Sequence, residues 1–99
     1  MLNITKSGEG EKLTYTLEGR LDTTTAPQLE AELKGALDGV KKLVLDFEKL
    51  EYISSAGLRV LLGAHKEMSK HGVMTLTNVN ETVMEIFEVT GFSDILTFE

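Results

Sequence analysis

The sequence predicts one α/β domain, with a mixed sheet of about five strands and helices packed on it. Alternating or continuous apolar segments typical of strands recur along the chain, and segments with helical spacing of apolar residues separate the later ones. The resulting order, β-β-α-β-α-β-α-β, predicts an edge hairpin followed by parallel strands joined by single helices. With 99 residues, 41% of them hydrophobic, the chain can bury one modest core, so we expect a single domain over residues 1–99.

The first elements are a hairpin and a helix. Leu2–Ile4 and Leu13–Leu17 alternate as edge strands do, and Ser7–Gly10 is the expected turn between them. A helix should begin near Ala26, because Pro27 suits a first helical turn, and Thr25 with Gln28 has the spacing of a capping box. The expected buried stripe of this helix consists of Leu29, Leu33, Ala36 and Leu37, and the expected stop is Gly39.

The middle of the chain passes from a strand to a helix. Leu43–Phe47 is predicted to be a buried central strand, and apolar residues at helical spacing follow from Leu58. The four residues just before Leu58 are Ser54, Ser55, Ala56 and Gly57. Two hydroxyls therefore stand at the start of a helix, where the first amides have no partner within the helix and favour a negative charge.

The last third of the chain again has a predicted strand followed by a predicted helix. Val73–Thr77 is predicted to be a strand, and Asn80 is a suitable N-cap for a third helix that ends at Gly91. The apolar face of that helix would consist of Val83, Ile86 and Phe87. Ile95–Phe98 is apolar enough for one final strand.

Polar residues follow three of the predicted strands. Parallel strands open their carboxyl ends on one edge of a sheet, where ligands of α/β proteins usually bind. This edge would bring together Asp22, Ser54, Ser55 and Asn78. Asp22 has two interpretations, either a cap or turn residue or a carboxylate placed beside a functional site.

Composition argues against several classes of function. Asp and Glu number 16 against 10 Lys and Arg, and the net charge of -6 disfavours binding to a nucleic-acid backbone. The absence of cysteine excludes disulfides and thiolate chemistry and is typical of a reducing compartment. The sequence shows no signal peptide and no apolar stretch of roughly 20 residues, so we expect a cytoplasmic protein without a membrane span.

The serine and histidine residues do not form the pattern of an enzyme. A serine hydrolase needs a His beside its Ser, but His65 lies ten residues beyond Ser55 in the same predicted helix, about 15 Å along its axis. His65 and His71 lack the spacing of a zinc pair, and the glycine motifs of nucleotide-binding loops are missing. We therefore expect no catalysis, no metal site and no cofactor.

Two interpretations of the serines stay open. Ser54 or Ser55 can be a plain helix cap. A phosphate on the capping serine would instead bring close to two negative charges to a helix N-terminus that tolerates them, and a partner fitted to a neutral serine would reject the modified form. Both interpretations can hold for the same residue.

The segments GRLDTTTAPQL and YISSAGLRVLL, together with the order of elements, resemble the STAS family, specifically the small single-domain anti-sigma factor antagonists of bacteria. The resemblance covers essentially the whole chain. It places Ser55 at the phospho-acceptor position, Ser54 where many members have Asp, and Asp22 at the family's Asp in the loop after the second strand. Ala56, Gly57 and Leu58 take the small, Gly and Leu positions, with Ala56 where many members have a second hydroxyl.

The resemblance implies a STAS-like fold and a partner switch. The unphosphorylated protein would bind an anti-sigma factor that is also a serine kinase with a GHKL-type ATPase fold, and so free a sigma factor. Phosphorylation of Ser55 would end the interaction, and a PP2C-type phosphatase would reset it. The partner-binding residues would be Asp22, Thr23, Thr24, Ser54, Ala56, Gly57 and Arg59. The alternative is a STAS subunit without a phosphorylation cycle, in a stress-signalling or lipid-transport assembly.

Overall fold

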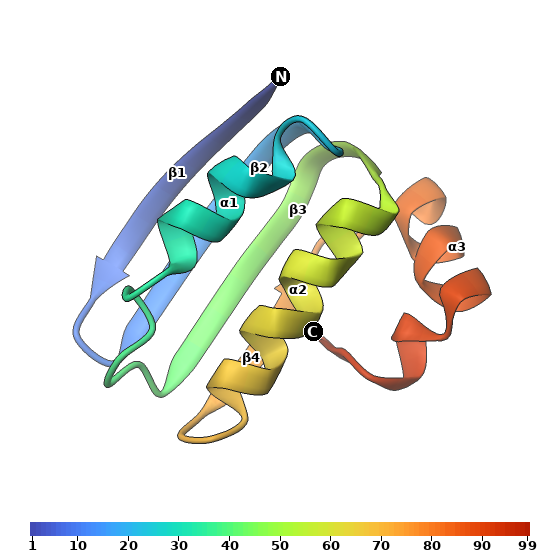
Figure 1. Cartoon of the computed structure of the whole chain (residues 1–99). Helices are drawn as coiled ribbons and strands as arrows, with labels where there is room; N and C mark the ends of the chain where they lie inside the picture. The colour runs from blue at the N-terminus through green and yellow to red at the C-terminus, as the bar shows by residue number, and fades with distance from the viewer.

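A mixed five-stranded sheet forms the centre of the computed structural model, with the spatial order β1-β2-β3-β4-β5 (Figure 1). The strands are β1 Leu2–Glu9, β2 Lys12–Leu21, β3 Lys42–Ile53, β4 Val73–Thr77 and β5 Thr97–Phe98. β1 and β2 are antiparallel, and every later pair of neighbours is parallel. The structure describes the backbone of residues 1–99 and every side chain except that of Glu9. The predicted α/β class, the five strands and the order of elements are confirmed.

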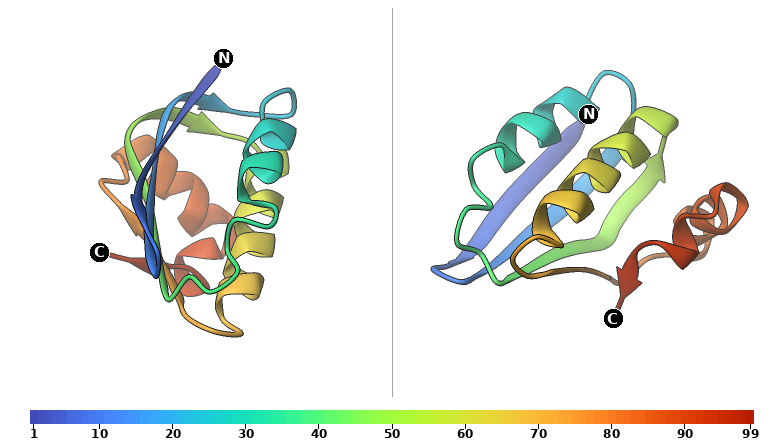
Figure 2. Two further views of the ribbon diagram at one scale, coloured as in Figure 1. Left: turned by 90° about the vertical axis from the view of Figure 1, so that its left-hand side faces the viewer. Right: turned by 60° about the horizontal axis from the view of Figure 1, so that its bottom comes forward.

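The helices are α1 Ala26–Leu33, α2 Ser55–Met68 and α3 Glu81–Thr90, followed by a short 3-10 turn at Phe92–Asp94. α1 and α2 lie side by side on one face of the sheet (Figures 1 and 2). α3 packs against the sheet through Phe87, whose ring centroid lies 6.2 Å from that of Phe47 and 5.5 Å from that of Phe98. The core therefore fills the space between the sheet and its helices.

The alternation of apolar and polar residues along β2 explains which face of the sheet the helices cover. Its apolar side chains point to one side, and the threonines between them stay half-exposed on the other. β3 adds further apolar residues on the covered side, in register with those of β2. The buried residues that the two strands supply to this face include Leu13, Tyr15, Leu17, Leu43, Leu45 and Phe47.

The predicted hairpin is correct, but its turn is shorter than expected. Ser7–Gly10 was the expected turn, whereas the strands continue until Glu9 pairs with Lys12 and only two residues remain between them. Gly10 begins this turn with a φ of 69°. Gly8 lies within the strand, where a Cβ atom would stand 2.6 Å from the Lys12 carbonyl oxygen. The glycine therefore permits close backbone approach and does not mark the turn.

The predicted end of the first helix is wrong. α1 ends at Leu33, well before Gly39; the chain leaves the helix at Lys34, which has a ψ of 120°, and Gly35 follows with a φ of 78°. Leu37 is still buried, yet it reaches the core from the turn that follows the helix. The spacing of apolar residues alone could not show whether Leu37 belongs to the helix or to the turn after it, because a short turn can continue the apolar stripe of a helix.

The predicted capping box at the start of α1 is also wrong. Thr25 Oγ1 donates to the carbonyl of Arg20 at 2.8 Å and accepts the backbone N–H of Asp22 at 2.8 Å. Gln28 Nε2 donates to the carbonyl of Leu2 at 3.0 Å. Thr25 therefore fixes the loop to β2, and Gln28 fixes α1 to β1.

β3 is much longer than the predicted strand Leu43–Phe47. It has 12 residues, and its last part pairs with β2 alone, because the pairing with β4 ends where Thr77 lies opposite Asp46. Beyond this point the carboxyl ends of β2 and β3 extend past the end of β4. This projection carries the start of α2.

The prediction for the third helix is confirmed. Asn80 caps α3, with its Oδ1 accepting the Val83 N–H at 2.9 Å, and Gly91 ends the helix with a φ of 84°. The final strand is shorter than predicted, since it contains Thr97–Phe98 and leaves Ile95 exposed.

Candidate functional site

Ser54 is the N-cap of α2. Its side chain accepts the N–H of Gly57 at a long 3.5 Å, and its carbonyl accepts the N–H of Leu58 at 2.9 Å. Its own N–H donates to the Leu21 carbonyl at 2.8 Å. The start of α2 is therefore fixed to the end of β2, and the capping interpretation of the two serines is confirmed for Ser54.

Ser55 is the first residue of α2, and its side chain is exposed. Among the described residues, none forms a hydrogen bond with its hydroxyl. The neighbouring Ser54 already caps the helix, so the Ser55 hydroxyl has no part in maintaining the fold. An incoming reagent can approach it from solvent.

Gly57 brings α2 close to the sheet. A Cβ atom at this position would stand 2.7 Å from Leu21 Cγ and 2.9 Å from Ile53 Cγ1, well inside ordinary contact distance. Only glycine lets the first turn of the helix rest on the ends of β2 and β3. Gly57 is buried, so it positions the exposed residues around it.

Asp22 organises the loop between β2 and α1. Its Oδ1 accepts the N–H of Thr24 at 3.0 Å, the N–H of Thr25 at 3.1 Å and the Thr24 hydroxyl at 2.8 Å. These bonds, the Thr24 hydroxyl first among them, hold the pKa of the Asp22 carboxyl below its usual range despite partial desolvation. The turn interpretation of Asp22 is thus confirmed.

Arg20 and Tyr52 form a pair that the sequence interpretation missed. The Arg20 guanidinium carbon lies 4.6 Å from the centroid of the Tyr52 ring, and its Nε lies 3.8 Å from Asp22 Oδ2. The two residues are neighbours in the register of β2 and β3. The pairing of β2 with β3 shifts in register between Gly19 and Arg20, and this shift places Arg20 opposite Tyr52. No pattern in the sequence predicts the shift.

Asn78 does not join this edge, so its predicted place beside the serines is wrong. Its Nδ2 donates to Asp46 Oδ1 at 3.1 Å. Asp46 precedes Ser54 by eight residues of mostly extended chain, about 25 Å at ~3.3 Å per residue. The cause is the unequal length of the strands, because β4 has 5 residues and β3 has 12.

The other predicted site residues lie around the start of α2. Thr23 and Thr24 are exposed in the loop that Asp22 organises, while Ala56 is half-buried and Arg59 is exposed on α2. The chain thus brings two segments together through the bond between the N–H of Ser54 and the β2 carbonyl of Leu21. We call the predicted set, which comprises Asp22, Thr23, Thr24, Ser54, Ser55, Ala56, Gly57 and Arg59, the docking edge.

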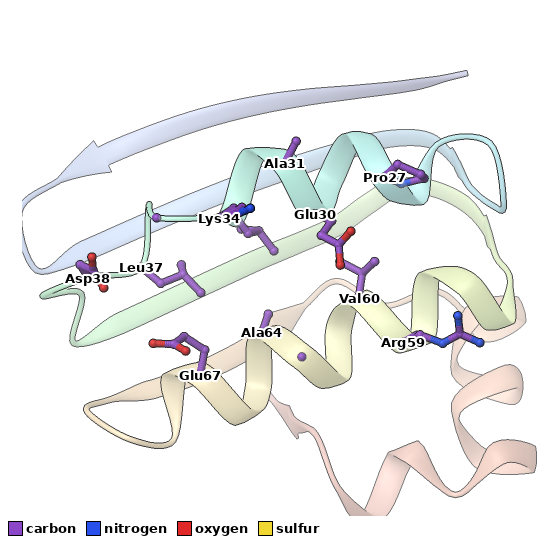
Figure 3. Close-up of a pocket in the computed structure, with 13 residues that line it drawn as sticks. Pro27, Glu30, Ala31, Lys34, Leu37, Asp38, Arg59, Val60, Ala64 and Glu67 are labelled. Atoms are coloured by element: carbon purple, nitrogen blue, oxygen red, sulfur yellow. The ribbon is translucent and has the colours of Figure 1, made fainter.

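A groove of about 630 Å³ lies between α1 and α2 (Figure 3). Its lining includes Glu30 of α1, and Arg59, Val60 and Glu67 of α2. Arg59 stands at the end of the groove nearest the start of α2, so it belongs to both the groove and the docking edge. His71 lies near the opposite end of α2, where its Nδ1 is 2.8 Å from the Val40 carbonyl.

Comparison with known proteins agrees with this architecture. The STAS domain family matches residues 3–99. BtrV of Bordetella bronchiseptica, which carries the name of an anti-sigma factor antagonist, is 43% identical over 81 residues, covering 80% of this chain and 70% of that protein. The anti-sigma-B factor antagonist of Staphylococcus aureus is 27% identical over 97 residues, covering 96% of this chain and 90% of its own.

Solved structures share the fold. The anti-sigma factor antagonist SpoIIAA in its unphosphorylated form superposes with a TM-score of 0.82 at 24% identity, over 100% of this chain and 88% of its own. The helices of the described chain lack the length and hydrophobicity that crossing a membrane requires. The chain therefore belongs to the STAS family, and the relatives that it matches are anti-sigma factor antagonists, which confirms the resemblance seen in the sequence.

Proposed function

We propose that this protein is a phosphorylation-controlled partner-switching regulator and not an enzyme. In its unphosphorylated form it binds, through the docking edge, an anti-sigma factor that is also a serine kinase with a GHKL-type ATPase fold. This binding frees a sigma factor in the cytoplasm. The relatives named as anti-sigma factor antagonists support the proposal, as do the structures of SpoIIAA in an unphosphorylated and a phosphorylated form.

The observation that carries the proposal is the different role of the two adjacent serines. Ser54 caps α2, whereas Ser55 is exposed and its hydroxyl forms no hydrogen bond with any described residue. A phosphoryl group can therefore be added to Ser55 without removing the cap from the helix. The exposed helix start also favours the negative charge that arrives.

The proposed reaction is an ordinary phosphoryl transfer. The Ser55 oxygen forms a bond to the γ-phosphorus of ATP, the bond from that phosphorus to the β,γ-bridging oxygen breaks, and ADP leaves. The hydroxyl proton passes to a base of the kinase. A PP2C-type phosphatase reverses the modification with water, releasing inorganic phosphate. As long as the phosphoryl group is on Ser55, its bulk and its nearly two negative charges prevent the kinase from binding the docking edge.

The remaining members of the docking edge would supply shape and polar contacts. The Oδ2 of Asp22 lies 3.8 Å from Arg20 Nε, while its Oδ1 accepts hydrogen bonds within the loop. Thr23 and Thr24 are exposed beside it. Gly57 acts indirectly, because it is buried and sets how closely α2 approaches the sheet.

Intact-mass measurement tests the acceptor. After incubation with the cognate kinase and ATP, wild type and Ser54→Ala should each gain one phosphoryl group, and Ser55→Ala should gain none. Ser54→Ala is the matched control, since it removes the neighbouring hydroxyl and leaves the acceptor. Circular dichroism would verify that both variants remain folded. Equal phosphate uptake by wild type and Ser55→Ala would refute the assignment of Ser55.

A further inference from the structure

We propose that Arg59 binds the phosphoryl group of phosphorylated Ser55 within the same helix, and that this contact withdraws Arg59 from the docking edge. The inference rests on the proposed phosphorylation of Ser55. It goes beyond that proposal by assigning the residue that holds the phosphoryl group, and by giving the modification a second effect on the binding surface.

The spacing of the two residues carries the first step. Ser55 begins α2, and Arg59 follows four residues later on the same helix. Side chains at this spacing lie on one face, with about 5–6 Å between their Cβ atoms. Figure 3 shows the Arg59 side chain directed along α2 toward the helix start, the direction that helical side chains generally take. The guanidinium is thus on the side where a phosphoryl group on Ser55 would stand.

Arg59 has no competing partner among the side chains that the structure describes. It is exposed, and it makes neither an ion pair within 4.0 Å nor a side-chain hydrogen bond with the described side chains. Glu30 of α1 and Glu67 of α2 face the same groove, but neither pairs with it. The other arginine of this region, Arg20, stacks on an aromatic ring and lies near a carboxylate.

Two of the backbone donors at the start of α2 are already occupied. The backbone amides of Gly57 and Leu58 already donate to Ser54, at 3.5 Å and 2.9 Å. A phosphoryl group on Ser55 would carry three strong acceptor oxygens and nearly two negative charges. The planar guanidinium of Arg59 can donate two parallel hydrogen bonds to such a group, which makes it a better partner than a lysine would be.

The consequence is a switch with two parts. In the unphosphorylated protein, Arg59 is a free cation of the docking edge and can bind an acidic group of the kinase. After phosphorylation the same guanidinium is occupied within its own helix. Phosphorylation would then add negative charge and also remove the positive charge that the partner binds.

The test measures the second pKa of the phosphoserine by phosphorus NMR. Phosphoserine is placed at position 55 during synthesis, so no kinase is needed. A nearby guanidinium favours the dianion, so the pKa in the wild-type background should be lower than in Arg59→Gln by about 0.15–0.4 units. Arg59→Lys should give an intermediate value, because it keeps the charge and loses the planar pair of donors.

Lys66→Gln is the matched control. It removes one positive charge from the same helix, eleven residues from Ser55 and about 16 Å along the axis. The phosphoserine pKa of Lys66→Gln should stay close to that of the wild-type background. An equal pKa in wild type, Arg59→Gln and Lys66→Gln would overturn the inference, and so would an equal rise in the two variants.

The arginine side chain offers a direct second measurement. The Nε–H resonance of Arg59 should shift on phosphorylation of Ser55 and move back as the phosphoserine is titrated to its monoanion. An unshifted resonance would contradict the contact. These outcomes are separate from the proposed function, because a kinase that leaves Ser55 unmodified refutes the acceptor assignment without affecting a measurement on synthetic phosphoserine.

Discussion

At the scale of single residues, the docking edge separates structural from reactive roles. Asp22 uses one carboxylate oxygen to hold its own loop, and Ser54 caps the neighbouring helix. Ser55 directly follows the capping residue Ser54, and no described residue binds its hydroxyl. The proposed acceptor thus stands beside residues that hold the backbone in place, so the proposed partner would meet a preorganised surface.

Asp22→Asn should flatten the acid dependence of stability. The folded-state pKa of Asp22 is lowered, mainly by the hydroxyl of Thr24. Its stabilising contribution is therefore complete above the ordinary pKa of about 3.9 and is lost as the pH falls through the lower folded value. Urea unfolding in steps between about pH 5 and pH 2 should show a smaller loss of unfolding free energy for Asp22→Asn than for wild type.

Asp38→Asn is the control for this experiment. Asp38 is exposed and forms no side-chain hydrogen bond or ion pair with the described residues. Its replacement should leave the shape of the pH profile unchanged. If both variants flattened the profile equally, the effect would reflect net charge and not the bonds that Asp22 makes.

At the scale of elements, α2 depends on its close approach to β2 and β3. Gly57→Ala should lower the free energy of unfolding by about 1–3 kcal/mol, because the new Cβ atom would overlap Leu21 and Ile53. Gly63→Ala, on the same helix, should raise it by about 0.5–1 kcal/mol, since no atom lies within 4 Å of the added carbon. Thermal unfolding compares the two, and a destabilising Gly63→Ala would contradict the explanation.

The elements also show what the sequence could reveal. Local patterns predicted every strand and helix in order, together with the Asn80 cap and the Gly91 stop. They failed for the length of β3, because its last residues are buried on one side only and pair with a single neighbour. They also failed for α1, whose apolar stripe continues into a non-helical turn through Leu37.

The sequence also predicted only part of the candidate site. The motif and the topology predicted that the loop of Asp22 and the start of α2 would meet, and the bond from Ser54 to Leu21 shows that they do. The prediction for Asn78 failed because it assumed strands of equal length. The pair of Arg20 and Tyr52 could not be predicted, since it depends on a register shift within β2 and β3.

At the scale of the whole molecule, the docking edge lies apart from much of the core. It comprises the loop after β2 and the start of α2, while Phe87 of α3 packs against Phe47 of β3 and Phe98 of β5. Within the docking edge Ser55 is exposed, whereas Gly57 is buried against Leu21 and Ile53, so a change of charge at Ser55 leaves the core packing in place. This arrangement would let the proposed phosphorylation of Ser55 alter binding without unfolding the domain.

Ser55→Asp tests this separation of binding from stability. An acidic residue at the first position of α2 faces the positive end of the helix, so the unfolding free energy should stay the same or rise by about 0.3–1 kcal/mol. Calorimetric titration against the cognate kinase should show binding at least about tenfold weaker, a loss of about 1.4 kcal/mol. A large fall in melting temperature would instead mean that Ser55 is needed for the fold.

Ser69→Asp is the matched control at the other end of the same helix. Ser69 is the C-cap of α2, and its hydroxyl donates to the Lys66 carbonyl at 2.9 Å. Aspartate here loses that bond and faces the negative end of the helix, so stability should fall by about 0.5–1 kcal/mol. Kinase binding should be unchanged, because position 69 is about 20 Å along the helix from Ser55. If Ser69→Asp weakened binding as much as Ser55→Asp, the loss would follow net charge and the docking edge would be misplaced.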